Sequence, residues 1–563
     1  MATESAALAG EGREAFERGD AEASQRAFEA ALVGGESGDL FEGLARARYL
    51  ASDYRGSIAA HERAFAAYRA EGDALGATRM ARIISWLYVN VFSDFAVAAG
   101  WLARAERLLE PGRDNDAERG WVELTHATHE SYGEVREQRL RDAWELGTSC
   151  GDADLEFAAL ARLGETLALS GRVEEGMLAF DEALTAVCAG EVRDLYVVES
   201  VFCALFLTCE RVHDVVRAEQ WLRAAGDLVR RRNLVCVGPL CRAHYGGILT
   251  AAGLWEEAES ELDEASRVFA GGYAAARAIV LVRLAALRVG QGRLEDAAVL
   301  LAGLDQVPDA ARPLAALQLA RGQTALAREL LERRLGAPEV SAPWPIGSTA
   351  PSPPAVAGPL LALLVDAHLA DGDVAAATEA GERLGAVAGT HPSPYLRGLL
   401  ARSLGRICVA SHSGDAKAWL REAVEQLSAA QLPVELARAR LDLAKAVAHD
   451  EPEVAVAEAK AALEVFERAP ALRDADQAAA LLRSLGTAER RSSRLGSTLT
   501  KRESEVLELL AHGLSNAQIA ERFFIAPKTA EHHVGHILAK LGLPSRAAAA
   551  AYAVRAAQGS GFE

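Results

Sequence analysis

The chain has 563 residues and a formal net charge of −19, and half of its residues are apolar. This length is several times that of a single hydrophobic core, so we expect several domains or an array of repeats. Alanine, leucine, arginine and glutamate dominate, and all four are strong helix formers. The acidic balance excludes a chain that binds nucleic acid along its whole length, because phosphates repel carboxylates.

Two further classes of protein are disfavoured. No stretch reaches the roughly 18 uninterrupted apolar residues that a membrane span requires, and the N-terminus lacks the basic start and apolar run of a signal peptide. The seven cysteines follow no disulfide or metal-ligand spacing, which favours reduced, buried thiols. We therefore expect a cytoplasmic protein without a bound metal or cofactor.

From the N-terminus onward, one pattern recurs along the chain. A helix of about a dozen residues ends at a small-residue turn, and an alanine-rich helix follows. The turns fall at Gly19-Asp20, Ser52-Asp53, Gly171-Arg172, Gly253, Gly292 and Gly372-Asp373. Their spacing, for example from 19 to 52 and from 253 to 292, is typical of tetratricopeptide-type helix pairs. At this period roughly a dozen pairs would fill residues 1–486, each burying its free face on its neighbour.

Two stretches interrupt this pattern. Residues 336–358 contain six prolines, which a helix interior does not tolerate. A PxxP ligand at Pro351–Pro354 is an alternative, but a linker is favoured. Residues 487–498 are polar and basic. The predicted organisation is a helical-repeat sensor block (1–335), a Pro-rich linker (336–358), a second helical-repeat block (359–486), a basic linker (487–498) and a C-terminal helical domain (499–558).

The C-terminal region differs in charge from the rest of the chain. From Gly496 onward it contains seven Lys and Arg against six Asp and Glu, so the acidic excess lies entirely in the preceding residues. Contact with nucleic acid should therefore be confined to this region.

Within residues 499–543 the pattern predicts three short helices. Thr500 with Glu503 and Ser515 with Gln518 form capping boxes, and Pro527 stands where a proline at the first helical position is favoured. A stripe of Val506, Leu507 and Leu510 on the first helix can meet Ile519 and Ala520 on the second.

The third predicted helix has two different faces. Residues expected to face inward recur at spacings of four, three and four: Ala530, Val534, Ile537 and Leu541. The residues left on the outer face are Lys528, Glu531, His532, Gly535 and His536. Two short helices joined by a tight turn, the second with a polar outer face, form an arrangement that places one helix in the DNA major groove.

This stretch resembles the C-terminal DNA-binding domain of the LuxR family of bacterial transcription regulators, over about 60 residues through a terminal helix at Arg546–Ala557. The matching positions are Leu499-Thr500, Arg502-Glu503, Glu505-Val506-Leu507, Ser515-Asn516, Ile519-Ala520, Thr529, His533, Ile537, Lys540-Leu541-Gly542 and Ser545-Arg546. Phe523, Ala526 and Ala530 depart from the family pattern, which has Leu, a capping Ser and Val there. A lost cap costs about 0.5–2 kcal/mol.

The resemblance implies roles for individual residues. Base edges should be contacted by Lys528, Glu531, His532 and Gly535, where lysine donates to guanine and glutamate accepts from cytosine. Phosphates should be contacted by Thr500, Ser515, Asn516, Thr529, Lys540 and Arg546. Asn516 fits a structural role beside the second cap equally well. The terminal helix is the expected dimer face.

Three further stretches allow a functional and a structural interpretation, and the structural or DNA-contacting one is favoured for each. His532, His533 and His536 have helical spacing for a metal, but they lack neighbouring acids and thiols. The aromatic-rich Trp86–Trp101 could line a ligand groove or pack inside a helix pair. Cys241–Tyr245, which resembles a segment of helical-repeat regulators, could bind an effector or form a buried polar network between repeats.

Motifs of catalysis are absent from the sequence: it has no phosphate-binding GxxxxGK(S/T) loop, no dinucleotide fingerprint after a strand, and no strand–helix alternation of a receiver domain. We therefore expect a non-enzymatic, all-α protein, a tetratricopeptide-like superhelix followed by a four-helix LuxR-type helix-turn-helix domain. It should be a homodimeric, sequence-specific transcription regulator, bound to double-stranded DNA at the nucleoid, whose arm senses an effector or partner protein. The alternatives are a repeat scaffold whose C-terminal domain binds protein, and an enzyme-regulatory subunit.

Overall fold

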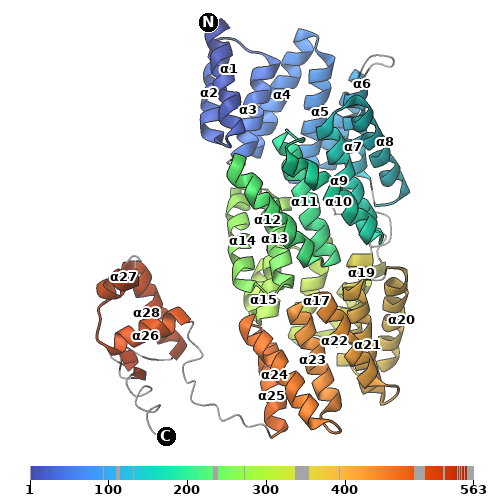
Figure 1. Cartoon of the computed structure of the whole chain (residues 1–563), viewed down its shortest axis with the longest axis vertical. Coiled ribbons are helices and arrows are strands. Elements are labelled where there is room, and N and C mark those ends of the chain that lie inside the picture. The colour runs from blue at the N-terminus through green and yellow to red at the C-terminus, as the bar shows by residue number, and fades with distance from the viewer. Residues whose placement is uncertain are drawn as a thin grey trace. The chain divides into compact units, whose positions relative to one another are not determined.

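The computed structural model describes residues 2–553 apart from 93, 110–114, 131, 233–238, 272, 337–353, 392, 487–500, 524–526, 542, 544, 547 and 551. All regular structure in this described part of the chain is helical (Figure 1). The chain divides into two compact units. We call Met1–Leu481 the arm and Leu482–Glu563 the C-terminal domain.

The first half of the arm consists of α1 (Ala2–Glu17), α2 (Ala21–Val33), α3 (Gly38–Leu50), α4 (Tyr54–Glu71), α5 (Ala74–Leu87), α6 (Phe95–Leu108), α7 (Asp116–His129), α8 (Glu134–Cys150), α9 (Ala153–Leu169), α10 (Val173–Ala189), α11 (Leu195–Val212) and α12 (Val215–Arg232). The second half consists of α13 (Pro239–Ala251), α14 (Trp255–Val268), α15 (Ala274–Gln291), α16 (Leu294–Leu301), α17 (Ala311–Ala320), α18 (Thr324–Gly336), α19 (Pro354–Ala370), α20 (Val374–Thr390), α21 (Pro394–Ser411), α22 (Ala416–Ala429), α23 (Pro433–Val447), α24 (Pro452–Arg468) and α25 (Leu472–Ser484). A π-helical turn, Tyr88–Phe92, extends α5, and 3-10 turns lie at Phe269–Gly271 and Pro308–Ala310.

The predicted helix pairs are confirmed. In the described part of the arm, α1 to α24 form twelve successive pairs, and α25 follows the last of them. Each predicted turn joins the two helices of one pair. Gly19 and Gly372 adopt φ of 75° and 77° there, a left-handed conformation that glycine reaches without steric cost. The following aspartate caps the next helix: Asp20 accepts from the backbone N–H of Ala23 at 3.0 Å, and Asp373 accepts from Ala376 at 3.0 Å.

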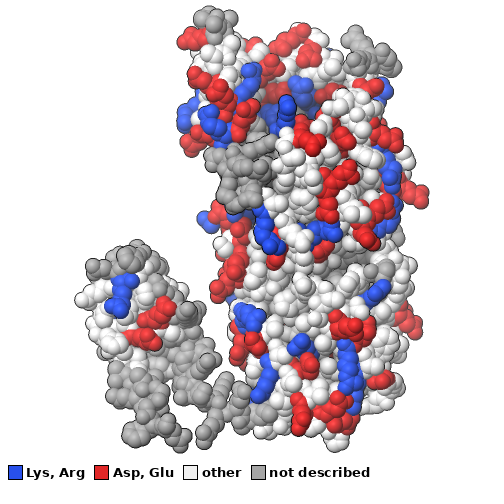
Figure 2. Space-filling view, viewed as in Figure 1, with Lys and Arg blue, Asp and Glu red and all other residues white. Residues whose placement is uncertain are grey.

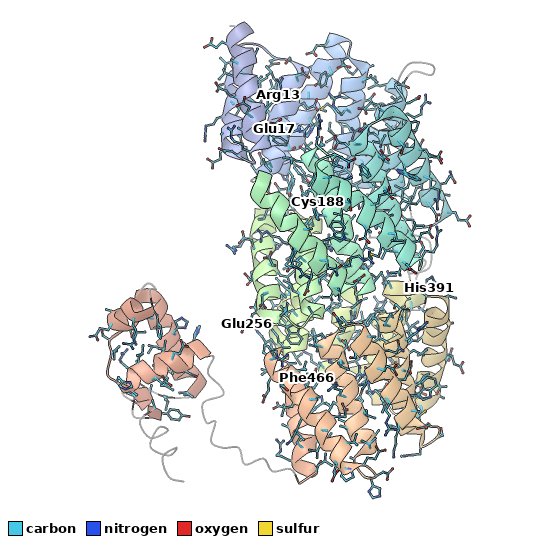
Figure 3. All side chains as sticks on the ribbon, viewed as in Figure 1. Arg13, Glu17, Cys188, Glu256, His391 and Phe466 are labelled. Atoms are coloured by element: carbon cyan, nitrogen blue, oxygen red, sulfur yellow. The ribbon has the colours of Figure 1, made fainter. Side chains whose placement is uncertain are left out.

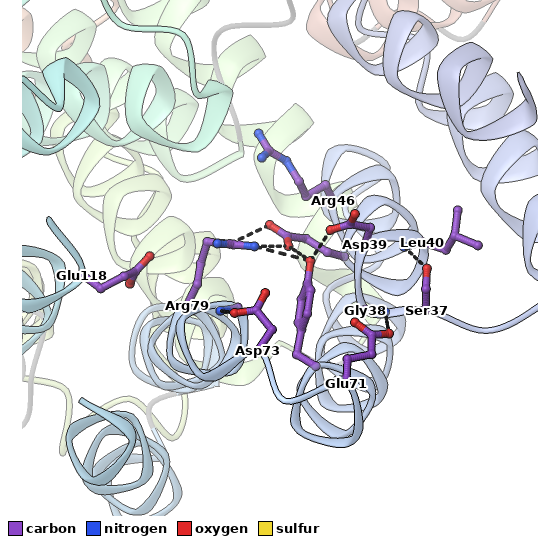
Figure 4. Close-up of polar contacts among 12 residues, drawn as sticks. Ser37, Gly38, Asp39, Leu40, Arg46, Glu71, Asp73, Arg79 and Glu118 are labelled. Carbon is purple, nitrogen blue, oxygen red and sulfur yellow. Dashed lines mark hydrogen bonds and ion pairs between the residues drawn. The ribbon is translucent and has the colours of Figure 1, made fainter. Parts of the chain in front are cut away.

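Polar contacts also join successive helices, as in the first repeats (Figure 4). Two guanidinium nitrogens of Arg79 on α5 donate to the two carboxylate oxygens of Glu42 on α3, at 3.0 and 2.8 Å. The hydroxyl of Tyr68 on α4 lies 2.7 Å from the same carboxylate. Burial acts to raise the pKa of Glu42, but the bonds and charge of Arg79 lower it overall. One ion-paired carboxylate therefore holds three helices in register.

The two predicted repeat blocks pack within the same unit. The ring of His213, after α11, stacks on Tyr395 of α21 with centroids 3.8 Å apart. His391, labelled in Figure 3, places Nε2 at 2.8 Å from the carbonyl oxygen of Ser170. Helix α19 begins at Pro354, four residues before the predicted end of the Pro-rich linker, because a proline in the first turn costs no hydrogen bond. Most of that linker, 337–353, lies outside the described residues.

The C-terminal domain contains α26 (Lys501–Ala511), α27 (Asn516–Phe523) and α28 (Pro527–Leu541), with helical residues again from Arg546. Its core is the predicted one, with Val506, Leu510, Ile519, Ala530 and Ile537 all buried in one cluster. The domain thus has its own hydrophobic core, separate from those of the arm.

Acidic and basic side chains are interspersed over the face of the arm in Figure 2, without one continuous basic surface. In the described part of the chain, no helix has the length and apolarity that a membrane crossing would require.

Candidate nucleic-acid interface

The start of α27 is fixed by a complete capping box. The hydroxyl oxygen of Ser515 accepts from the backbone N–H of Gln518 at 3.3 Å, and the side-chain oxygen of Gln518 accepts from the backbone N–H of Ser515 at 2.8 Å. Both bonds satisfy backbone donors that a helix N-terminus otherwise leaves unpaired. The predicted cap is therefore confirmed. It sets the direction in which α27 leaves the preceding turn, where Gly513 ends α26 with φ 79°.

Helix α28 has the two faces that the sequence predicts. Ala530, Val534 and Ile537 are at most 6% exposed and pack against α26 and α27. On the opposite face, Gly535 and His536 are exposed. A Cβ atom added at Gly535 would meet no other atom within 4 Å. This position on the outer face is therefore open to a partner that approaches the helix closely.

Two of the predicted phosphate-binding residues contact each other. The guanidinium of Arg546 donates to the side-chain oxygen of Asn516 at 2.6 Å and also to the backbone carbonyl of Leu514. These bonds tie the terminal helix to the start of α27. Since Asn516 uses its oxygen for Arg546, its amide N–H groups are the part that can donate to a phosphate. The predicted structural role of Asn516 and its predicted DNA contact are thus compatible, and the sequence alone gave no sign of the Arg546 contact.

The other residues predicted to contact DNA lie wholly or partly outside the part of the chain that the structure describes. Thr500 lies outside the described residues, as does its capping box with Glu503, although Glu503 itself is only 3% exposed. The backbones of the other predicted contact residues are helical, but their side chains lie outside the described part: Lys528, Thr529, Glu531, His532 and Lys540. On α28, Lys528, Glu531, His532 and Gly535 fall three or four residues apart, so their helical positions share one face.

The terminal helix contributes to the core of the C-terminal domain. Ser545 caps its start by accepting from the N–H of Ala548 at 3.2 Å. Ala549 is fully buried, and Tyr552 and Ala553 pack on the same cluster. One face of this helix is thus used internally. Residues 554–563, which include the end of the predicted dimer helix, lie outside the described residues.

In the arm, both stretches singled out in the sequence form packed structure. His244, within Cys241–Tyr245, is 1% exposed, and its Nδ1 lies 2.8 Å from the Glu210 carboxylate. Arg283 donates to both oxygens of that carboxylate, at 2.8 and 2.6 Å. Burial raises the pKa of Glu210, but Arg283 and His244 outweigh it and hold the pKa at about 2. The favoured interpretation, a buried polar network between repeats, is therefore confirmed.

The aromatic stretch Trp86–Trp101 likewise packs inside the repeats. Trp86, Tyr88 and Phe92 border a core cluster with Tyr54 and Tyr273. Trp101 packs edge-on against Phe65, with ring centroids 5.2 Å apart. This agrees with the favoured packing role. Elsewhere, no group of three His, Cys, Asp or Glu side chains among the described residues could hold a metal ion.

Two short helices joined by a tight turn, the second with an open outer face, define a helix-turn-helix domain. Residues 497–553 match the family of bacterial regulatory proteins named luxR, and the C-terminal domain belongs to that family. It is 46% identical over 83 residues to the DNA-binding transcriptional activator DevR/DosR of Mycobacterium tuberculosis, a match covering 15% of this chain and 37% of the relative. The chain is also 47% identical over 57 residues to the oxygen regulatory protein NreC of Staphylococcus aureus, and this match covers 10% of this chain and 26% of the relative. The chain thus spans well under two thirds of these relatives.

Solved helical-repeat structures also align with the chain. Yeast Tom70 aligns over 80% of this chain and 98% of its own, with 11% identity and a TM-score of 0.36. The Cut9-Hcn1 hetero-tetramer of APC/C aligns over 98% of this chain and 96% of its own, with 12% identity and a TM-score of 0.35. The description of the arm as tetratricopeptide-like rests on its own helix pairs.

Proposed function

We propose that the chain is a sequence-specific DNA-binding transcription regulator in which α28 enters the major groove. The observation that carries this proposal is the open outer face of α28, in a domain of the luxR family. A recognition helix must present its outer residues to base edges while its inner face holds the domain together. The buried Ala530 and Ile537 opposite the exposed Gly535 and His536 meet both requirements.

Within this proposal the residue roles divide into two groups. Lys528, Glu531, His532 and Gly535 face base edges, where Lys528 donates to guanine and Glu531 accepts from a cytosine amino group. The phosphate contacts, which fix register without reading sequence, are Thr500, Ser515, Asn516, Thr529, Lys540 and Arg546. The bond from Arg546 to Asn516 supports a joint role at one phosphate, because it holds both side chains at the N-terminus of α27.

The arm supplies regulation in this proposal. It binds an effector or partner protein and shifts the population of dimers that are competent to bind DNA. Dimerisation through the terminal helix would place two α28 helices about one DNA turn apart. The chain acts without catalysis, in the cytoplasm and at the nucleoid when bound.

Fluorescence anisotropy of the full chain with mixed genomic duplex tests DNA binding directly. We expect binding at about 50 mM salt that weakens steeply by about 200 mM, because binding releases counterions from the phosphates. Lys540→Ala should weaken binding to all sequences and reduce the slope of log affinity against log salt by about one. Arg397→Ala, which removes an equal charge from an exposed site on the arm, should leave both unchanged.

Absence of binding at low salt would contradict the proposal. In that case capture of a protein by the C-terminal domain, without DNA, would favour the repeat scaffold. If Lys540→Ala changed the preference at one base pair only, the phosphate role of Lys540 would be wrong.

A further inference from the structure

The arm contains a cavity of about 660 Å³ that is open to solvent. It is lined mainly by the first helices of successive pairs, α11, α13, α15, α17, α19, α21 and α23, together with α25. These helices come from both repeat blocks, so the cavity exists only because residues 200–320 and 354–477 pack together. Its volume falls within the range of roughly 300–1,000 Å³ that is typical of small-molecule sites.

The lining of this cavity is unusually basic for this chain. Among the described residues, eight arginine and lysine side chains line it, against six aspartates and glutamates, whereas the chain as a whole carries a net charge of −19. A concave surface with low-dielectric walls concentrates the field of its charges. The cavity should therefore attract anions although the rest of the molecule repels them.

Most of these basic side chains are already neutralised by a carboxylate of the lining. Arg211 pairs with Asp309 at 2.7 Å, Arg283 with Glu210 at 2.6 Å, and Arg402 with Asp442 at 2.8 Å. Arg406 and Arg438 are ion-paired in the same way. Lys445 donates to the side-chain oxygen of Gln477 at 3.1 Å.

Two exposed arginines of the lining differ from these. Within the described part of the chain, neither Arg312 nor Arg473 has a carboxylate oxygen within 4.0 Å of its guanidinium nitrogens. The charge of Arg312 acts on the nearby Tyr395 and Glu435. Because no ion pair among the described residues holds either exposed side chain, each can turn its planar set of N–H donors toward a ligand. This donor geometry matches the two oxygens of a carboxylate or phosphate.

The two arginines belong to different walls. Arg312 lies on α17, near His213 and Tyr395. Arg473 lies on α25 beside the turn at Gly292. A Cβ atom added at Gly292 would lie 3.2 Å from the Cγ atom of Arg473. A ligand held by both would therefore contact α17 and α25 together.

His213, which also lines the cavity near Arg312, has an unusual backbone conformation for a residue at a turn. Its φ of 60° is left-handed, a conformation that glycine adopts at the corresponding turns Gly253 and Gly292 and that strains a residue with a side chain. Its ring stacks on Tyr395 at the edge of the cavity. The stacking holds α11 against α21, and so fixes the two blocks that form the cavity.

We propose that this cavity binds a small organic anion carrying phosphate or carboxylate groups, held by Arg312 on one wall and Arg473 on the other. The inference rests on the proposed function in one respect, since it makes this anion the effector of the arm. Binding itself requires no DNA, so the two can be tested apart.

Isothermal titration calorimetry of the full chain, at constant ionic strength, tests the site with two probes, pyrophosphate and citrate. We expect at least one of them to bind with one site per chain. The double variant Arg312→Gln/Arg473→Gln should weaken that binding at least about tenfold, because each arginine contributes charge-assisted hydrogen bonds. Preference for pyrophosphate or for citrate then identifies phosphate or carboxylate as the group recognised.

A matched control separates the site from the overall charge. Arg107→Gln/Arg397→Gln removes two exposed arginines of the arm outside the cavity and should keep wild-type affinity. The melting temperature of both double variants without ligand should equal that of the wild type, since all four residues are exposed. Equal affinity of the two double variants, or binding of neither probe, would overturn the proposal, as would binding of an acidic peptide alone.

The consequence for regulation is measured separately, as the DNA affinity of the full chain with and without the bound probe. A probe that binds the arm while the chain ignores duplex DNA leaves the anion site standing and overturns the regulator. A chain that binds DNA but neither probe overturns the anion site and leaves the proposed regulator standing.

Discussion

The arm and the C-terminal domain use their polar residues in opposite ways. In the arm, charged side chains are buried in pairs between helices, as Glu210 is with Arg283 and Glu165 is with Arg136. In the C-terminal domain, the described outer positions Gly535 and His536 of α28 are exposed, and a Cβ atom added at Gly535 would meet no atom of another element within 4 Å. Polar residues of the arm hold repeats in register, whereas the exposed His536 of α28 is accessible to a partner. In the function that we propose, polar residues therefore serve structure in one region and recognition in the other.

The comparison predicts that breaking a buried pair of the arm has the largest effect on stability. Arg283→Met should lower the free energy of unfolding of the arm by about 3–5 kcal/mol, because it leaves the Glu210 carboxylate buried without its main partner. Chemical denaturation followed by circular dichroism measures this loss. DNA binding by whatever protein remains folded should be unchanged.

A double variant sharpens this test. In Glu210→Gln/Arg283→Met no charge is left unpaired, so the loss should be clearly smaller than the sum of the two single losses. Arg397→Met changes an exposed residue that forms no ion pair with the described part of the chain, and it should cost less than about 0.5 kcal/mol. A loss below about 1 kcal/mol for Arg283→Met would show that the arm does not depend on its buried pairs.

Acid should also act on the arm through its buried histidines. His61 is fully buried, with Nδ1 at 2.9 Å from the carbonyl of Ser57, and burial lowers its pKa from 6.5 to about 4. The folded arm therefore keeps His61 neutral while the unfolded chain binds a proton below pH 6.5, so stability is lost as the pH falls from 6.5 towards 4. Between pH 7 and pH 5 this single group accounts for about 2 kcal/mol.

The variant His61→Gln isolates that contribution. The drop in unfolding free energy between pH 7 and pH 5 should be smaller than in the wild type by about 2 kcal/mol, whatever the variant costs at pH 7. Burial lowers the pKa of His213 as well, so part of the loss of stability at acid pH should remain in this variant. An unchanged pH dependence would mean that His61 is accessible to protons in the folded arm.

The two regions also differ in how far the sequence predicts them. The core and outer face of α28 follow from residues three or four apart, so Ala530, Val534 and Ile537 could be assigned as buried directly. The repeat turns were predictable for the same reason, since Gly19 and Asp20 act locally. The cavity was not, because Arg312 and Arg473 are 161 positions apart in the chain and line one cavity only through the packing of the two blocks. The hydrogen bond between Asn516 and Arg546 was not predictable either, since the sequence around each residue does not indicate its partner.

For the C-terminal domain, the largest expected effect is on binding rather than stability. Lys528→Ala should weaken specific DNA binding by about 1–3 kcal/mol and relax the preference at one base pair, with the thermal stability of the chain unchanged. Affinity measurements on a set of single-base operator variants would show both effects. An unaltered footprint and affinity would place the recognition surface elsewhere than on α28.

The smallest effect is expected at the cap of α27, where the domain does depend on a polar residue for structure. Ser515→Ala removes the acceptor of the Gln518 N–H and should cost the C-terminal domain about 1 kcal/mol. Ser515→Asp keeps an acceptor beside the helix N-terminus and should retain most of the stability, but its negative charge would repel a phosphate. If Ser515 only caps the helix, the aspartate variant should bind DNA as the wild type does. If it also contacts a phosphate, as we propose, the aspartate variant should be stable yet bind all duplexes more weakly, a combination that unfolding and anisotropy measurements on the same protein would reveal.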